Sequence, residues 1–317
     1  MPAASWFAKR TGARTRDAWV GVHAQAGGLA AARAATLVAN RRPRVLACHR
    51  VDTAQGLPAL QQWWAGFGSR RVGASLLLRA HEYQILQIEA PAVEPAELRS
   101  AARWQIQDLI DFPADEAALD CLQLPAAPSS QAGAKLLAVV ARQALVQQNV
   151  TQWRSAGLAL NVIDIPEMAL RNLAVLAGGT QACAFVHVGL DETHLILLWQ
   201  EELCVSRQLA LGGQQLRALD ELARGAQLER LGLEIQRTVD AFGRQFSAAH
   251  LTQLWVSAVH DVEGVTRVLA DQLSLQVQAY RLADWIDLEP DVKLEDPDQR
   301  VDYALAIGAA LREVPAS

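Results

Sequence analysis

The chain has 317 residues, of which 51% are hydrophobic and 20% charged, and its formal net charge is −5. This length suits two ordinary domains or one two-lobed unit, and the composition is too apolar for an intrinsically disordered protein. The negative charge argues against nucleic acid as a partner, because phosphate binding requires a basic surface. No apolar run reaches the roughly 18–20 residues that cross a bilayer, and the first residues lack the apolar segment of a signal peptide. We therefore expect a cytoplasmic protein.

The first 17 residues are predicted to form a basic arm. They contain the aromatic pair Trp6-Phe7 and four basic residues against a single acidic one, Asp17. Such a composition is typical of a solvated, poorly ordered tail. Contact with an acidic membrane surface or with a partner protein is the open alternative.

The next part of the chain is predicted as a β-meander followed by alternating elements. Apolar runs separated by short polar or glycine-containing breaks indicate consecutive antiparallel strands. The predicted elements are strands at 19–24, 29–38 and 45–51, a helix at 57–67, and strands at 72–78 and 83–89.

Residues from about 91 to 141 are predicted as a small inserted α/β subdomain. Leu98, Ala102 and Ile106 recur every four residues and give a helix one apolar face. Trp104 lies off this stripe, so it either packs on a second element or meets a partner. Phe112-Pro113 ends the helix, and strands are predicted at 117–124 and 135–141.

The second half repeats the design of the first. The stretch 182–211 reads as three apolar runs with polar breaks, which predicts a second meander, about 160 residues after the first; this spacing favours an internally duplicated fold. Pro166 opens a helix to residue 176. The other predicted elements are helices at 143–156, 214–224, 231–246, 262–273 and 303–312, strands at 158–165, 251–258 and 275–280, and an acidic loop at 284–302.

Several segments, in order over about residues 90–312, resemble one family. They are ELRSAARWQIQDLIDFPADEAALDCLQL, LLAVVARQALVQQNVTQWRSAGL with NVIDIPEMAL, FVHVGLDETHLIL with LALGGQQL, LGLEIQRTVDAFGRQF and YALAIGAALRE. The chain resembles the PilM family of type IV pilus assembly, including the MshI proteins of mannose-sensitive haemagglutinin-type pili. The resemblance implies an α/β fold that is actin-like (ribonuclease H-like), duplicated and two-lobed, similar to actin and FtsA. Lobe I is expected at 18–177 with the insertion, lobe II at 178–302, and a final helix at 303–317 returning to lobe I.

The same resemblance implies an ATP cleft whose motifs are altered here. In the family the first phosphate loop follows a strand ending in Asp-x-Gly; this place reads Val22-His23-Ala24, with Gly27-Gly28 slightly later. The second loop reads His187-Val188-Gly189 in place of Asp-x-Gly. The adenosine loop reads Ser257-Ala258-Val259-His260 in place of a glycine pair, whereas Gly212-Gly213 are retained.

These changes predict a vestigial nucleotide cleft. Histidine is a poor ligand for Mg²⁺ and supplies no fixed negative charge, and Ala258 and Val259 add Cβ atoms where a purine and ribose approach the backbone. We expect no cofactor and weak or absent ATP hydrolysis, with nucleotide binding without turnover as the open alternative. The residues expected to remain of this cleft are Gly27, Gly28, His187, Gly189, Gly212, Gly213 and Ser257.

The polar residues between 187 and 194 could also suggest a metal site. His187 and His194 differ by seven positions, however, so on one regular strand they face opposite sides. A polar turn is therefore the expectation and no metal is predicted. The chain also contains no Gly-x-Ser-x-Gly or Walker loop, so hydrolase and P-loop kinase functions lack sequence support.

Partner binding is assigned to the insertion. By resemblance, the tail of a membrane-anchored PilN-like protein lies in the groove between this insertion and lobe I. An aromatic anchor beside polar groups at a helix end is typical of an interface, and the candidates are Trp104, Gln107, Asp108, Ile110 and Phe112. The alternative for Ile110 and Phe112 is that they belong to the core.

The expected function is that of a cytoplasmic scaffold at the inner face of the bacterial inner membrane. It would bind a PilN-like tail and other pilus assembly platform proteins, with homo-oligomers possible and no nucleic acid. Two other hypotheses stay open: a nucleotide-dependent switch or ATPase of the same fold, and an FtsA-like or GspL-like component of another machine.

Overall fold

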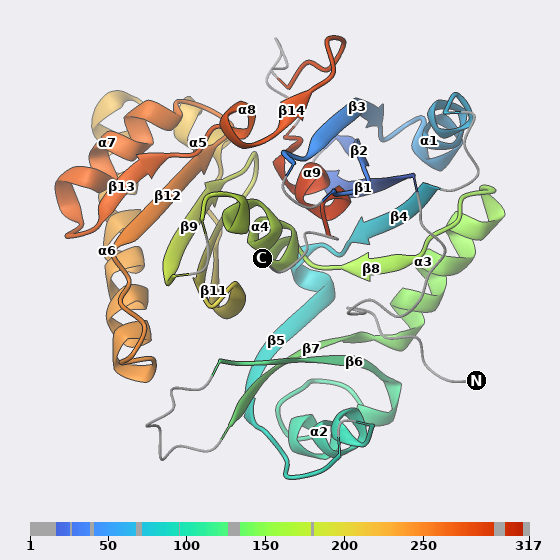
Figure 1. Cartoon of the computed structure of the whole chain (residues 1–317), viewed down its shortest axis with the longest axis horizontal. Coiled ribbons are helices and arrows are strands. Elements are labelled where there is room, and N and C mark those ends of the chain that lie inside the picture. Colours follow the sequence, from blue (N-terminus) through green and yellow to red (C-terminus); the bar gives the residue numbers. More distant parts are fainter. Residues whose placement is uncertain are drawn as a thin grey trace.

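The computed structural model describes residues 17–25, 27–38, 41–67, 72–94, 96–125, 134–178, 181–294 and 302–312. The predicted basic arm, apart from Asp17, lies outside the described residues, as do residues 295–301 of the acidic segment. Figure 1 shows two lobes side by side, each built on a sheet, with a smaller sheet-and-helix unit below the first lobe.

The first lobe is built on a six-stranded mixed sheet with the order β14-β3-β2-β1-β4-β8. Its first three strands form the predicted antiparallel meander, and β4 and β8 are added in parallel on the other side of β1. The strands are β1 (Ala18–Gln25), β2 (Gly28–Ala35), β3 (Arg44–Asp52), β4 (Val72–Leu77), β8 (Val162–Asp164) and β14 (Asp287–Leu288).

The second lobe repeats this arrangement in a five-stranded sheet with the order β11-β10-β9-β12-β13. Every residue of β9 and β10 is buried, which explains their nearly continuous apolar sequence: central strands are covered on both faces. The strands are β9 (Cys183–Val188), β10 (Thr193–Trp199), β11 (Glu202–Leu209), β12 (Gln253–Ala258) and β13 (Gln276–Ala279). The repeated order, three antiparallel strands and then a parallel one, confirms the predicted duplication.

Two buried helices join the lobes. The last helix, α9 (Ala304–Ala310), packs against β1 and β2, and α4 (Pro166–Leu176) packs against both α9 and the second sheet. Their close approach depends on a glycine, because a Cβ at Gly308 would lie 2.2 Å from the carbonyl oxygen of Ala169. The other α-helices are α1 (Gly56–Ala65), α3 (Gln143–Ser155), α5 (Gly213–Ala218), α6 (Glu221–Gln245), α7 (Val262–Gln272) and α8 (Leu282–Trp285).

The insertion is a separate three-stranded sheet, order β5-β7-β6, with one helix on it. Its elements are β5 (Tyr83–Glu89), α2 (Leu98–Ile106), β6 (Ala117–Gln123) and β7 (Lys135–Arg142), with short 3₁₀ helices η1 (Ala80–Glu82) and η2 (Ala114–Glu116). The predicted segment of about 91–141 left β5 outside. The sheet includes it because β5 pairs with β7 along its whole length.

Two predictions about elements are wrong. The helix expected at 214–224 is divided: α5 ends at Ala218, and α6 begins after Asp220, whose carboxylate caps it by accepting a hydrogen bond from the Ala223 N–H at 2.8 Å. The acidic segment at 284–302, expected to be a loop, contributes β14, which pairs with the edge strand β3. Within the described ranges, no helix is both long and apolar enough to span a membrane.

A candidate cleft between the lobes

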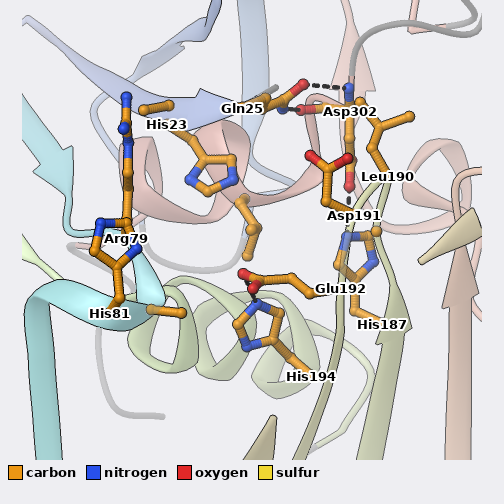
Figure 2. A pocket seen from close by; sticks show the side chains of 14 residues that line it. His23, Gln25, Arg79, His81, His187, Leu190, Asp191, Glu192, His194 and Asp302 are labelled. Carbon is orange, nitrogen blue, oxygen red and sulfur yellow. Dashed lines mark hydrogen bonds and ion pairs between the residues drawn. The ribbon is translucent and has the colours of Figure 1, made fainter. Parts of the chain in front are cut away.

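A cavity of about 260 Å³ lies where both lobes and the start of the insertion meet. The end of strand β1 contributes one wall, the β9–β10 hairpin a second, and the segment that leads into β5 a third (Figure 2). The side chains with charge or an imidazole that line it are His23, Arg79, His81, His187, Asp191, Glu192, His194 and Asp302. The cavity is therefore polar, and histidine is its commonest ionisable residue.

His187 and His194 lie on the same face of the β9–β10 hairpin. They are directly opposite each other in the antiparallel register, so the expectation that they face opposite sides is wrong. The parity rule holds within one strand, whereas directly paired residues on adjacent antiparallel strands point the same way. Even so, no three His, Cys, Asp or Glu residues among those described are grouped closely enough to hold a metal ion.

His187 forms a buried hydrogen-bonded pair with Asp302. Its Nε2 lies 2.6 Å from Asp302 Oδ2, and its Nδ1 lies 3.1 Å from the Ser257 hydroxyl. Burial raises the pKa of Asp302, but the effects of His187, of the Ala304 N–H hydrogen bond and of His23 together outweigh burial, so the net pKa is lowered. Ser257, predicted to belong to the adenosine loop, thus orients His187.

Asp302 also fixes the start of α9. Its Oδ1 accepts a hydrogen bond from the Ala304 N–H at 2.9 Å, and its own N–H donates to Gln25 Oε1 at 3.1 Å. The Gln25 amide donates in return to the Asp302 carbonyl (Figure 2). Asp302 therefore joins β9 of the second lobe to β1 and α9 of the first, directly across the cleft.

His23 points into the cavity from β1 (Figure 2). Among the described residues, nothing forms a hydrogen bond with its Nδ1. Burial lowers its pKa to about 4, and the attraction of Asp302 does not restore it. His23 is therefore neutral at physiological pH, and it carries no negative charge that would attract a cation.

The predicted glycines of the cleft are used for close backbone packing. The Gly213 N–H donates to the Gly189 carbonyl at 2.7 Å, and a Cβ at Gly212 would lie 2.2 Å from the Leu190 carbonyl oxygen. Gly27 has φ +87° in the β1–β2 turn, and a Cβ at Gly28 would lie 2.0 Å from the Val51 carbonyl oxygen. The Gly213 N–H is already satisfied inside the protein.

The altered adenosine loop packs over the retained glycine pair. The Val259 N–H donates to the Val188 carbonyl at 3.0 Å, and a Cβ at Gly213 would meet the His260 ring at 3.1 Å. Side chains of this loop thus occupy space next to Gly213.

The five candidate partner residues divide into two groups. Trp104 is 78% exposed on α2, and Gln107 and Asp108 after it are exposed as well. Ile110 and Phe112 pack against the core of the insertion, which agrees with the alternative interpretation for these two.

A second cavity of about 340 Å³ lies between the first sheet, α1, α3 and the start of the insertion. Its lining combines apolar side chains with the amides of α3: Leu29, Leu57, Leu76, Leu145, Trp153, Gln148, Asn149 and Gln152. The predicted partner residues line neither cavity. The apolar residues of α3 that face the first sheet could have indicated this groove from the sequence.

Sequence reasoning also missed Asp302, the acidic partner of the cleft. It lay in a segment interpreted as an acidic loop, where seven other acidic residues surround it in the sequence. An Asp shortly before a run of small apolar residues is a helix-capping pattern, and this pattern distinguishes Asp302 from its neighbours.

Comparison with known proteins identifies the family. Residues 47–224, more than half of the chain, match the family "Type IV pilus assembly protein PilM". A solved "PilM-PilN type IV pilus biogenesis complex" is 23% identical, with 94% of this chain and 99% of that chain covered and a TM-score of 0.69.

Two further solved structures are more distant. One is the cytoplasmic domain of EpsL, an inner membrane component of the type II secretion system of Vibrio cholerae: 11% identity, 93% of this chain, 94% of that chain, TM-score 0.46. The other is a protein of Bacteroides thetaiotaomicron with an actin-like ATPase fold: 10% identity, 88% and 94% covered, TM-score 0.46. No curated protein matches the chain. The two-lobed actin-like fold is confirmed, and the chain belongs to the PilM family of type IV pilus assembly proteins.

Proposed function

We propose that this protein is a scaffold of a pilus assembly platform of the mannose-sensitive haemagglutinin (MshI) type. It holds the cytoplasmic tail of a PilN-like membrane protein at the inner face of the membrane and does not turn over ATP. The observation that carries the proposal is the buried His187–Asp302 pair, which engages the Asp302 carboxylate at the cavity where the family resemblance places Mg²⁺ and phosphates.

The chemistry of this pair argues against metal-dependent phosphate transfer. An actin-like cleft holds Mg²⁺ with carboxylates, which position the attacking water and neutralise developing charge. The Asp302 carboxylate already accepts the Ala304 N–H and lies 2.6 Å from His187 Nε2. Binding Mg²⁺ there would require the carboxylate to give up one or both of these buried contacts.

Protein binding is supported by the family and by the second cavity. The similar solved structure is a PilM bound to PilN by its name, and we infer the same class of partner here. The apolar floor and amide rim between α3 and the first sheet suit an extended peptide, with side chains in the groove and its backbone at the rim.

A nucleotide-binding switch of the same fold is the second candidate. The cavity between the lobes favours it, since a binding change there could alter the angle of the lobes. It would differ from the scaffold in showing partner binding that depends on nucleotide.

The scaffold is tested by calorimetry with the cytoplasmic tail peptide of a PilN-like protein from the same organism. Leu145 is half-buried in the groove and Leu222 is 87% exposed on α6 of the other lobe. We expect Leu145→Arg to weaken binding at least tenfold, or about 1.4 kcal/mol, because a charge replaces an apolar contact. The matched Leu222→Arg variant should bind like the wild type. Equal affinity of the wild type and both variants for the peptide would exclude this groove as the binding site.

A further inference from the structure

The insertion exposes apolar side chains that the proposed function does not use. Trp104 of α2 is 78% exposed, and Leu109 in the turn after this helix is 53% exposed. Neither side chain lines the cavity between the lobes or the groove beside α3. A large exposed aromatic residue next to an exposed leucine is typical of a surface that another segment covers.

The exposed charges around these two side chains are mainly acidic. Arg103 of α2 is held inside the insertion, where it donates to the Ala117 carbonyl at 2.9 Å, and the exposed Arg142 lies 3.6 Å from Asp111. Trp104, Leu109 and the exposed carboxylates of this region together form what we call the acidic α2 surface. The carboxylates are Glu97, Asp108, Asp111, Asp115 and Glu116.

The beginning of the chain has the complementary composition. Residues 1–16 of the basic arm contain the aromatic pair Trp6-Phe7, four basic residues and no acidic one. The basic residues are Lys9, Arg10, Arg14 and Arg16. Opposite charges favour the encounter of two surfaces, and aromatic rings that meet bury a large apolar area.

The basic arm joins the fold close to the insertion. The ring of Trp19, near the start of β1, lies 5.8 Å from Arg312 Cζ, and Arg312 Nη1 donates to Asp164 Oδ2 at 2.8 Å. Asp164 lines a small cavity together with Asp120 of β6. Asp120 in turn lies 3.4 Å from Arg99, in the first turn of α2. A short series of neighbouring side chains thus leads from the start of β1 to α2.

The arm is long enough to cover this separation. Trp104 lies five residues after Arg99, which is about 7.5 Å along a helix. The ten residues from Phe7 to Arg16 span up to about 35 Å when extended. The aromatic pair can therefore reach Trp104 of the same molecule.

We propose that the basic arm docks on the acidic α2 surface of its own molecule, with Trp6-Phe7 against Trp104 and the basic residues facing the carboxylates. Because the arm is tethered nearby, its effective concentration is on the order of millimolar, so a weak contact is mostly occupied. A protein that binds the acidic α2 surface must displace the arm. This contact does not involve the groove beside α3, so the inference goes beyond the proposed function.

The test is hydroxyl-radical labelling of the full chain, with the oxidation rate of Trp104 measured by mass spectrometry. Leu222, 87% exposed on α6, is the internal reference. The arm variant carries Lys9→Glu, Arg10→Glu, Arg14→Glu and Arg16→Glu. The matched control makes the same change of charge at exposed arginines of the second lobe: Arg207→Glu, Arg230→Glu, Arg244→Glu and Arg267→Glu. We expect Trp104 to be oxidised about fivefold faster in the arm variant than in the wild type and the control.

Reversing the other side of the contact completes the test. Asp108→Lys, Asp115→Lys and Glu116→Lys together should speed the oxidation of Trp104 as well, and combining them with the arm variant should restore the slow rate. Equal rates in the wild type and the arm variant, or no restoration in the combined variant, would overturn the proposal. So would protection of Trp104 that is lost on dilution, because the occupant would then be a second molecule.

Discussion

At the scale of single residues, the two histidines of the cleft have different roles. His187 is held between Ser257 and Asp302, with one ring nitrogen against each of them. His23 is buried without a partner for its Nδ1 among the described residues, and its pKa is lowered to about 4. The first histidine stabilises the junction, whereas the second makes it sensitive to acid.

His23 predicts a specific pH dependence of stability. Its folded pKa of about 4 lies below the ordinary value of 6.5, so between these values the unfolded chain binds more protons. The contribution is fully present above pH 6.5 and is lost as pH falls toward 4; it amounts to about 3 kcal/mol. Urea unfolding of the wild type should show this loss between pH 6.5 and 4, and His23→Gln should lack it.

The exposed His81, at the mouth of the same cavity, provides the control. His81→Gln should keep the wild-type pH profile. A wild-type profile for His23→Gln as well would show that His23 is already solvated in the folded protein.

At the scale of elements, the contact of α4 with α9 depends on the absence of a side chain. A Cβ at Gly308 would lie 2.2 Å from the Ala169 carbonyl oxygen, and that atom belongs to a helix backbone that cannot move aside cheaply. We expect Gly308→Ala to lower the free energy of unfolding by about 1–3 kcal/mol through overpacking.

Gly225, in the first turns of α6, is the matched control because nothing lies within 4 Å of its added Cβ. Gly225→Ala should stabilise the protein by about 0.5–1 kcal/mol, since alanine has the higher helix propensity. Thermal unfolding of the two variants tests whether Gly308→Ala lowers the stability and Gly225→Ala raises it. Equal shifts would mean that α9 does not pack on α4 as described.

Elements with a strong local signal were predictable, and contacts between distant segments were not. The helix opened by Pro166 ends at residue 176 as predicted, and β5 has its predicted bounds. In contrast, β14 is two residues long, and it is a strand only because β3 offers a free edge. The His187–Asp302 pair joins residues 115 positions apart, so neither the pairing of His187 nor the register that brings it opposite His194 could be obtained from spacing.

At the scale of the whole molecule, the duplicated lobes enclose a cleft that the protein bridges with its own groups beside a cavity of about 260 Å³. The second lobe supplies His187 and Ser257, and the first supplies Gln25 and α9, whose Ala304 N–H donates to Asp302. The groove beside α3 adjoins this cleft and shares Ala24, Gln25 and Arg79 with it, whereas Trp104 is exposed on the insertion and lines neither cavity.

The most direct test of this account is titration of the wild type with ATP and Mg²⁺ in a calorimeter, together with an assay of phosphate release. Asp302→Asn provides the reference, because it removes the charge that pairs with His187 and is nearly the same size. We predict no saturable heat and no phosphate release above background from the wild type. Stoichiometric binding of the magnesium–ATP complex, with turnover that Asp302→Asn abolishes, would contradict the account.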